Sequence, residues 1–280
     1  MYMKTTSLSL RVTLLALSLA FFSINVQAAS ITSFFPTAIT RLTMISSPGI
    51  WSDFWSFFRP GVKPSKEEKT EKTAIRSAQA IDISLPCDIE ILQKKGARPM
   101  CIAKGAENYV DLLECTEKNG ILSIRLKDSK KISNPDRLFL TIQVDQLQEI
   151  KLRGVGDTKI KGLMQQEKLA IYSSGVGDIR MEHIDVQQLT LKQKGVGDLY
   201  AKGKCRYAIL SNSGVGDFRT KELICDTAEI KNSGVGDMNC HVTDLVSVRN
   251  SGVGDLSLTS TARIKELSNN GVGNLTINKK

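Results

Sequence analysis

Six aspartates recur at one position of a repeated tetrapeptide, Gly-Val-Gly-Asp, and their type and spacing could support metal chemistry. They are Asp157, Asp178, Asp198, Asp217, Asp237 and Asp255. If successive repeats stack, the carboxylates form one file about 5 Å apart. Like charges at that spacing repel unless each is hydrogen-bonded, neutralised or bound to a cation. Calcium prefers such oxygen ligands, so a calcium ladder is one interpretation of the file.

A structural role for the aspartates is the other interpretation, and the sequence favours it. An aspartate can fold back onto backbone N–H groups and shape a turn. The calcium-binding β-helix repeat is a nonapeptide, whereas this tetrapeptide recurs every 18 to 21 residues. Each repeat also supplies one carboxylate, where calcium takes roughly six to eight ligands. The seventh copy carries Asn274, which forms turns as well as aspartate does.

The elements that position these residues are predicted by the glycines. A period near twenty residues is too short for a pair of helices and fits one coil of a β-solenoid. Glycine adopts positive φ without penalty, so a glycine pair gives every coil the same sharp corner. The corner glycines are Gly154, Gly156, Gly175, Gly177, Gly195, Gly197, Gly214, Gly216, Gly234, Gly236, Gly252, Gly254, Gly271 and Gly273.

Alternating apolar columns flank each corner. Four residues before the first glycine stand Ile150, Ile171, Leu191, Leu210, Ile230, Val248 and Leu267. Four residues after it stand Thr158, Ile179, Leu199, Phe218, Met238, Leu256 and Leu275. We expect these columns to point inward and stack between coils, with the corner valines packed inward or against one another. Asn212, Asn232, Asn250 and Asn269 share a further column whose amides can bond along the stack.

The rest of the chain is divided by composition. Residues 1–28 have a basic start, an apolar core and a small-residue cleavage site, typical of a secretory signal peptide. Residues 29–73 combine an aromatic-rich segment with a charged linker. Residues 74–150 predict irregular cap layers, and residues 151–280 the regular coils of one solenoid domain. The aromatic segment predicts a short helix with Trp51, Phe54, Trp55 and Phe58 on one stripe, either plugging the solenoid or touching a membrane peripherally.

The net charge of the chain indicates which classes of binding partner to expect. The formal net charge is +9, and an exported basic protein favours anionic envelope glycan, lipid or another envelope protein over nucleic acid. The candidate anion-binding residues are Lys151, Lys159, Arg180, Lys192, Arg219, Lys231 and Arg249. We expect no cofactor, and a location in the periplasm, at the cell surface or outside the cell.

Six cysteines and two histidines are the remaining reactive residues. Cys87 and Cys101 flank a stretch shaped like a hairpin, which predicts a disulfide across it. Cys205 and Cys225 stand nine residues before their glycines, so adjacent coils place them within disulfide range. Neither histidine is spaced with a nucleophile, and a regular aspartate file is unlike an active site. We therefore expect no enzyme, with a carbohydrate-active β-helix enzyme as a weaker alternative.

Residues 74–280 resemble the putative auto-transporter adhesin head GIN domain family. The resemblance lies in "AIDISLPCDIEIL" and "NGILSIRL" at the start and in "LQEIKLRGVGDTKI" where the repeats open. It implies a right-handed parallel β-solenoid in the cell envelope, with an adhesive role and no established catalysis. The expected function is therefore a non-catalytic binding or scaffold module, with a calcium-stabilised solenoid as the alternative.

Overall fold

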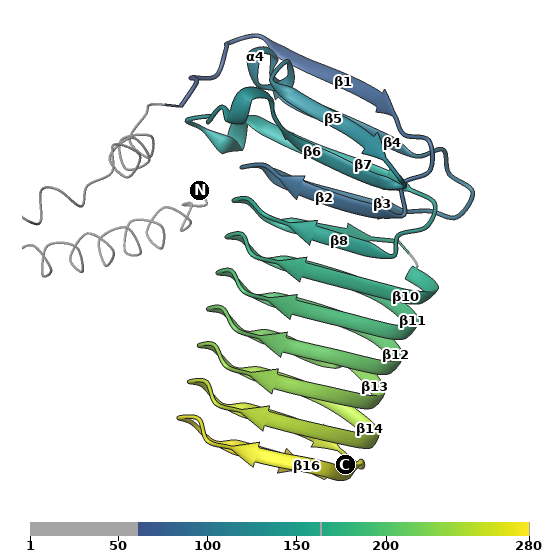
Figure 1. The fold of residues 1–280 in the computed structure, drawn as a ribbon, viewed down its shortest axis with the longest axis vertical. Helices are drawn as coiled ribbons and strands as arrows, with labels where there is room; N and C mark the ends of the chain where they lie inside the picture. Colours follow the sequence, from purple (N-terminus) through teal and green to yellow (C-terminus); the bar gives the residue numbers. More distant parts are fainter. Residues whose placement is uncertain (1–60, 163, 280) are drawn as a thin grey trace, which may run out of the picture. The chain divides into compact units, whose positions relative to one another are not determined.

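The computed structural model describes residues 61–162 and 164–279, which form a parallel β-solenoid (Figure 1). The predicted signal peptide and the aromatic stripe lie outside the described residues. No helix within residues 61–162 and 164–279 is long and apolar enough to cross a membrane.

Seventeen strands make up the described solenoid. The first nine are β1 (Glu68–Ala74), β2 (Ala80–Ser84), β3 (Asp88–Gln93), β4 (Met100–Ala106), β5 (Leu113–Lys118), β6 (Ile121–Leu126), β7 (Leu138–Val144), β8 (Glu149–Leu152) and β9 (Thr158–Lys161). The others are β10 (Met164–Ser173), β11 (Ile179–Gln193), β12 (Leu199–Asn212), β13 (Phe218–Asn232), β14 (Met238–Asn250), β15 (Leu256–Ser260), β16 (Arg263–Asn269) and β17 (Leu275–Asn278). Helix α4 (Glu107–Val110) and the short 3₁₀ helices η1 (Lys127–Ser129) and η2 (Pro135–Arg137) complete the set.

Each regular coil contains one corner and one bend. In β11 the chain leaves a corner at Ile179, bends at His183, where φ is 61°, and runs back to the next corner at Gln193. The first part pairs in parallel with β9 and the second with β10. The solenoid therefore has two strand ladders, which we name by position: the pre-corner ladder leads into the corners and the post-corner ladder leaves them.

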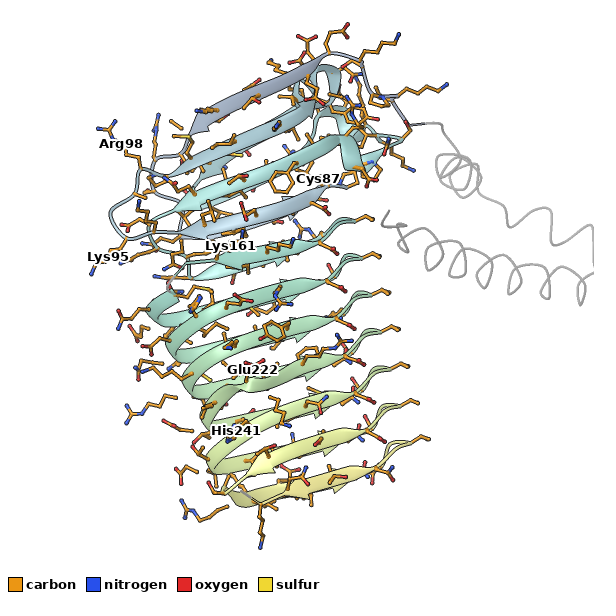
Figure 2. The ribbon with its side chains drawn as sticks, turned by 180° about the vertical axis from the view of Figure 1, so that it is seen from behind. Cys87, Lys95, Arg98, Lys161, Glu222 and His241 are labelled. Atoms are coloured by element: carbon orange, nitrogen blue, oxygen red, sulfur yellow. The ribbon has the colours of Figure 1, made fainter. Side chains whose placement is uncertain are left out.

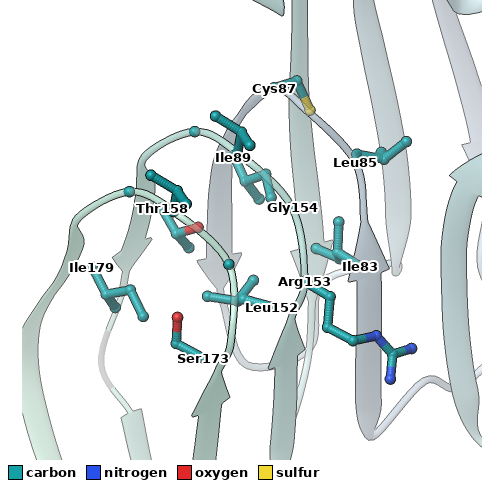
Figure 3. Close-up of a pocket in the computed structure, with 15 residues that line it drawn as sticks. Ile83, Leu85, Cys87, Ile89, Leu152, Arg153, Gly154, Thr158, Ser173 and Ile179 are labelled. Carbon is teal, nitrogen blue, oxygen red and sulfur yellow. The ribbon is translucent and has the colours of Figure 1, made fainter. Parts of the chain in front are cut away.

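The two ladders enclose the core between them. Figure 3 shows the chain arching over two corners, with Leu152 before one and Ile179 after the next pointing into the space between the limbs. The predicted inward columns are confirmed, because Ile150, Leu191 and Phe218 are all fully buried. In the final coil no further layer covers these columns, and Leu267 is 45% exposed.

The layers do not follow the order of the chain. Strand β2 pairs in parallel with β6 on one side and β8 on the other, and β3 pairs in the same way with β7 and β9. The β2–β3 coil is therefore inserted between β6–β7 and β8–β9. The first regular layer of the stack is thus the β2–β3 coil, which starts at residue 80, whereas the predicted boundary of the regular coils is residue 151.

Antiparallel strands close the N-terminal end of both ladders. Strand β5 pairs antiparallel with β6 in the pre-corner ladder, and β4 pairs antiparallel with β7 in the post-corner ladder. Helix α4 joins β4 to β5 and buries Tyr109 and Val110. The irregular N-terminal layers therefore form a cap, as the sequence predicts, and β1 adds a last antiparallel strand to β4.

Two expectations about this cap are wrong. The stretch from Cys87 to Cys101 is no hairpin, because β7 lies between β3 and β4 and pairs with both. Residues 68–73 are part of strand β1 and not of a linker. That strand forms an edge with mostly exposed side chains, so its charged sequence lacks the apolar alternation that predicts a strand.

Candidate functional site

The corner aspartates form a continuous hydrogen-bonded ladder. Oδ1 of Asp157 accepts the backbone N–H of Asp178 at 2.9 Å, and the contact repeats from coil to coil until Asp255 accepts that of Asn274 at 2.8 Å. The four intervening distances are 2.7 to 2.9 Å. Each carboxylate thus satisfies a backbone donor that the turn leaves unpaired, which is the structural role that the sequence favours.

The ladder starts one coil earlier than the tetrapeptide does. Oδ1 of Asp88 accepts the N–H of Asp157 at 2.9 Å, and Pro86 bridges Val155 in the valine position. Leu85-Pro86-Cys87-Asp88 is therefore an eighth corner that has no glycine. The glycine pattern does not find this corner, although the alignment of "SLPCDIEI" with "RGVGDTKI" carries the signal.

The two glycines of a corner serve different purposes. The second has φ of 130° to 143° in every copy, a region that side chains avoid. The first has ordinary φ but lies against the coil before it. A Cβ placed on any of these first glycines would lie 1.9 to 2.3 Å from a carbonyl oxygen of that coil. Positive φ thus explains one glycine, and close stacking explains both.

The corner valines point outward, so of the two arrangements expected for them, packing inward or against one another, the inward one is wrong. They lie in register along the edge of the stack, joined by parallel backbone bridges. Their side chains are 41% to 70% exposed. They form a narrow apolar file beside the aspartates.

A buried polar column supports the corners from inside. Asn212, Asn232 and Asn250 are at most 1% exposed, and each amide oxygen accepts the N–H of the first glycine two residues on, at 3.1 to 3.3 Å. Bonding along the stack, as predicted, occurs from Asn250 to Asn269 at 2.8 Å. The main contact of this column is therefore within each corner.

The predicted basic residues divide between the two ladders. Lys151, Lys192, Lys231 and Arg249 align on the pre-corner ladder, and Lys159, Arg180 and Arg219 on the post-corner ladder. Because the ladders lie on either side of the core, these seven residues do not make one surface. Figure 2 shows side chains over one face of the stack, with Lys161 and Glu222 among them.

Carboxylates neutralise much of the post-corner face. Arg219 lies 2.7 Å from Asp198 and 3.5 Å from Asp217, so it bridges two corner aspartates. Arg180 pairs with Glu182 at 3.1 Å and covers the ring of Tyr200, with its guanidinium carbon 4.2 Å from the ring centre. Among the predicted residues of this face, Lys159 alone has no ion pair within the described part of the chain.

The pre-corner face contains a groove of about 490 Å³ with unpaired lysines. Its lining includes Lys192, Lys194, Ile209, Ser211, Ser213, Glu229, Ile230, Lys231, Ser233, Ser247, Arg249, Lys265 and Glu266. Both acids are engaged: Arg249 holds Glu266 at 2.6 and 2.7 Å, and Glu229 accepts a hydrogen bond from Tyr207. None of the four lysines forms an ion pair within residues 61–162 and 164–279. The groove therefore keeps positive charge available.

The structure contains no disulfide among the six cysteines, and one of the two predicted pairs does not consist of nearest neighbours. Cys205 and Cys225 occupy paired positions on β12 and β13, as expected, with Sγ atoms 3.1 Å apart. Cys101 lies 3.9 Å from Cys115, so its thiol neighbour across the cap is not the predicted Cys87. Burial raises the pKa of Cys87 to about 12 and that of Cys240 to about 11.

The histidines occupy ordinary positions in the coils. His183 is exposed at the bend of β11, and His241 lies half-buried within β14. The described residues contain no group of three or more His, Cys, Asp or Glu side chains that could hold a metal ion. What the arrangement provides is a rigid stack with two polar faces, one of which carries an unneutralised basic groove.

These features define a parallel β-solenoid built to present regular surfaces. The family described as "Putative auto-transporter adhesin, head GIN domain" matches residues 79–278. The chain belongs to this family.

Solved structures show the same fold. A putative adhesin from Bacteroides fragilis shares 29% identity over 78% of this chain and 100% of its own, with a TM-score of 0.75. A putative adhesin from Parabacteroides merdae shares 15% identity over 78% and 99% of the two chains, with a TM-score of 0.60. A putative lipid binding protein from Parabacteroides distasonis shares 17% over 76% and 98%, with a TM-score of 0.60. No curated protein matches the chain significantly.

Proposed function

We propose that the protein is an exported, non-catalytic adhesion module of the cell envelope that binds an anionic polysaccharide along the pre-corner groove. The observation that carries the proposal is the set of four unpaired lysines in that groove. A polymer with one negative charge every few ångströms matches basic side chains held on a fixed lattice of layers.

The register of the coils sets the spacing of these charges. Lys192, Ser211, Lys231 and Arg249 stand in consecutive layers of one column. Layers about 4.8 Å apart place Lys192 and Lys231 roughly 10 Å from each other. That separation fits alternate residues of a charged sugar chain, and the Ser211 hydroxyl between them supplies a hydrogen bond to a sugar hydroxyl.

The lining favours a glycan over a lipid. Only Ile209 and Ile230 contribute aliphatic side chains to the groove, so it offers little surface to an acyl chain. One structure of the same fold is described as a putative lipid binding protein. The groove of this chain does not offer the apolar lining that an acyl chain would need. The aromatic stripe of Trp51, Phe54, Trp55 and Phe58 remains a prediction for peripheral membrane contact.

Binding to heparin, a sulfated glycan, tests the proposal. We compare the wild-type protein with the double variant Lys192→Glu/Lys231→Glu and with the matched control Lys118→Glu/Lys159→Glu. The control changes the net charge equally at exposed lysines outside the groove. We expect the groove variant to lose roughly tenfold in affinity, about 1.4 kcal/mol, and the control to bind nearly as the wild type does.

Two results would contradict the proposal. If the wild type is not retained on heparin at low salt, the groove does not bind anionic glycan. If both double variants weaken binding equally, the attraction comes from net charge and not from the groove. A column of uncharged dextran shows whether retention needs the charge of the polymer.

A further inference from the structure

Four of the six cysteines lie in two close pairs. Cys205 and Cys225 are in-register neighbours on β12 and β13, with Sγ atoms 3.1 Å apart. Cys101 on β4 and Cys115 on β5 have Sγ atoms 3.9 Å apart.

The placement of Cys205 and Cys225 suits disulfide formation. Adjacent parallel strands lie about 4.8 Å apart, inside the range of about 4.4 to 6.8 Å that disulfides allow between Cα atoms. Cys205 and Cys225 therefore need only a small side-chain rotation to bond. Cys101 and Cys115 both line a pocket of about 310 Å³, which leaves space for the rotation that their longer separation requires.

The surroundings of the two pairs differ. Cys205 and Cys225 are 4% and 1% exposed and belong to the core. Cys115 is only half-buried, and its pocket is also lined by Glu71 and Lys127. A hydrogen bond with Cys101 lowers the pKa of Cys115, and the same bond raises the pKa of Cys101. Cys115 is thus the thiol that an external disulfide reaches first.

We propose that the protein carries two disulfides of different accessibility: Cys205–Cys225, which forms only while the coils assemble, and Cys101–Cys115, which exchanges in the folded protein. Cys87 and Cys240 stay as thiols, because the sulfur contacts of the described residues join Cys101 to Cys115 and Cys205 to Cys225, and the Cys240 sulfur instead accepts a hydrogen bond from Thr220. The proposal rests on an oxidising location outside the cytoplasm and not on glycan binding.

The chemistry is thiol–disulfide exchange with a second disulfide, either of an envelope oxidoreductase or of a small molecule. The thiolate of Cys115 attacks one sulfur of that disulfide and releases the other as a thiol, which leaves a mixed disulfide. The thiolate of Cys101 then attacks Cys115 Sγ and releases the second thiol. Two cysteine thiols are oxidised to one disulfide, and the external disulfide is reduced to two thiols.

Alkylation with mass mapping tests the pairing in the exported wild-type protein. The protein is denatured with iodoacetamide present and no reductant, digested, and mapped. We expect Cys87 and Cys240 alone to be alkylated, with linked peptides joining Cys101 to Cys115 and Cys205 to Cys225. Alkylation of all six cysteines, or a linked peptide that contains Cys87, would overturn the proposal.

Oxidation of the reduced protein tests the difference in accessibility. Folded, reduced protein is treated with glutathione disulfide, and each bond is followed by quenched alkylation. We expect Cys101–Cys115 to form roughly tenfold or more faster than Cys205–Cys225. When the protein refolds from denaturant with the same oxidant, both bonds should form. Equal rates in the folded protein would sink the claim.

Matched cysteine variants distinguish the loss of one disulfide from misfolding of the whole protein. Cys87→Ser/Cys240→Ser should keep both bonds, and Cys115→Ser should lose one bond and keep Cys205–Cys225. Loss of Cys205–Cys225 in a Cys115→Ser protein with unchanged circular dichroism would contradict the assignment. Because the mapping uses the wild type, it decides the pairing even if a variant fails to fold.

Discussion

The corner aspartate contributes to this protein as a hydrogen-bond acceptor for the backbone. Its Oδ1 atom accepts the N–H of the next corner at each step of the ladder, which ends at the N–H of Asn274. This contact needs an acceptor oxygen, which a neutral amide also offers. We therefore expect the turn to require the oxygen and not the charge.

Substitution at Asp217 separates shape from charge. We expect Asp217→Asn to change the free energy of unfolding little, because the amide oxygen still accepts the N–H of Asp237. Asp217→Ala should cost about 1 kcal/mol, the usual net contribution of one hydrogen bond. Urea unfolding measures both, with Asp226→Ala, an exposed aspartate of the same coil, as the control. Equal losses for Asn and Ala would show that the charge matters.

Calcium should have no effect on stability. Each corner carboxylate already bonds to a backbone donor, and one carboxylate per coil is far from the number of ligands that calcium takes. We expect the same melting temperature in excess calcium and in chelator. A rise in Tm with calcium would revive the metal ladder, because a ligand bound only by the folded state stabilises it.

The corner glycines should tolerate no side chain. A Cβ on Gly197 would lie 2.1 Å from the carbonyl oxygen of Gly177, at a φ of 139°. We expect Gly197→Ala to destabilise the protein by roughly 3 kcal/mol or more, since backbone must move. Gly96→Ala is the control, because Gly96 also has positive φ (74°) but open space around it. It should cost about 1 kcal/mol. Similar losses at both sites would refute the argument from close stacking.

At the scale of elements, the coil was predictable and the cap was not. Columns of matching apolar residues define each regular coil, because every coil packs only on its two neighbours. The corner at Asp88 escaped because it contains no glycine, and the strands beside its coil on the outer side, β6 and β7, belong to a segment without the tetrapeptide. The partnership of Cys101 with Cys115 depends on how antiparallel strands fold over the cap, which no local pattern records. Among the basic residues that line the pre-corner groove, the sequence indicates Lys192, Lys231 and Arg249. Lys194 and Lys265 were not predicted, because the register of the layers brings them beside the other three.

Removing one whole coil should leave a folded protein. Deletion of residues 214–233 joins Ser213 to Gly234 and restores the same local sequence, Asn-Ser-Gly-Val-Gly-Asp. The product should unfold cooperatively with a smaller dependence on urea, because it buries less surface. Deletion of residues 214–223 is the contrast: it removes half a coil and puts Ile224 and Asp226 where the two corner glycines stood, so we expect an insoluble chain. A folded product from the half-coil deletion would show that register is not what holds the stack.

At the scale of the whole molecule, the solenoid has one closed end. The antiparallel strands and α4 cover the first layers, and insertion of β2–β3 between later segments ties this cap to the regular coils. An exposed strand edge offers unpaired backbone groups to other chains. The cap is therefore expected to keep the molecule from associating at that end.

A chain that begins at residue 147 tests the function of the cap. It would expose the edges of β8 and β9 that now pair with β2 and β3. We expect it to form oligomers or aggregates, whereas the chain from residue 61 stays in one form under the same conditions. Size-exclusion chromatography with light scattering measures both. A monodisperse truncated monomer would contradict this role.

Three corners are spelled with the same six residues, Asn-Ser-Gly-Val-Gly-Asp, at residues 212, 232 and 250. In each of them the buried asparagine bonds within its own corner, and the aspartate joins that corner to the next coil. Genetic exchange between two such copies would add or remove one coil without disturbing the reading frame or the register. The number of coils can therefore change by one in a single recombination event. The polar faces of the stack would lengthen or shorten by one layer, and the corner sequence would stay the same.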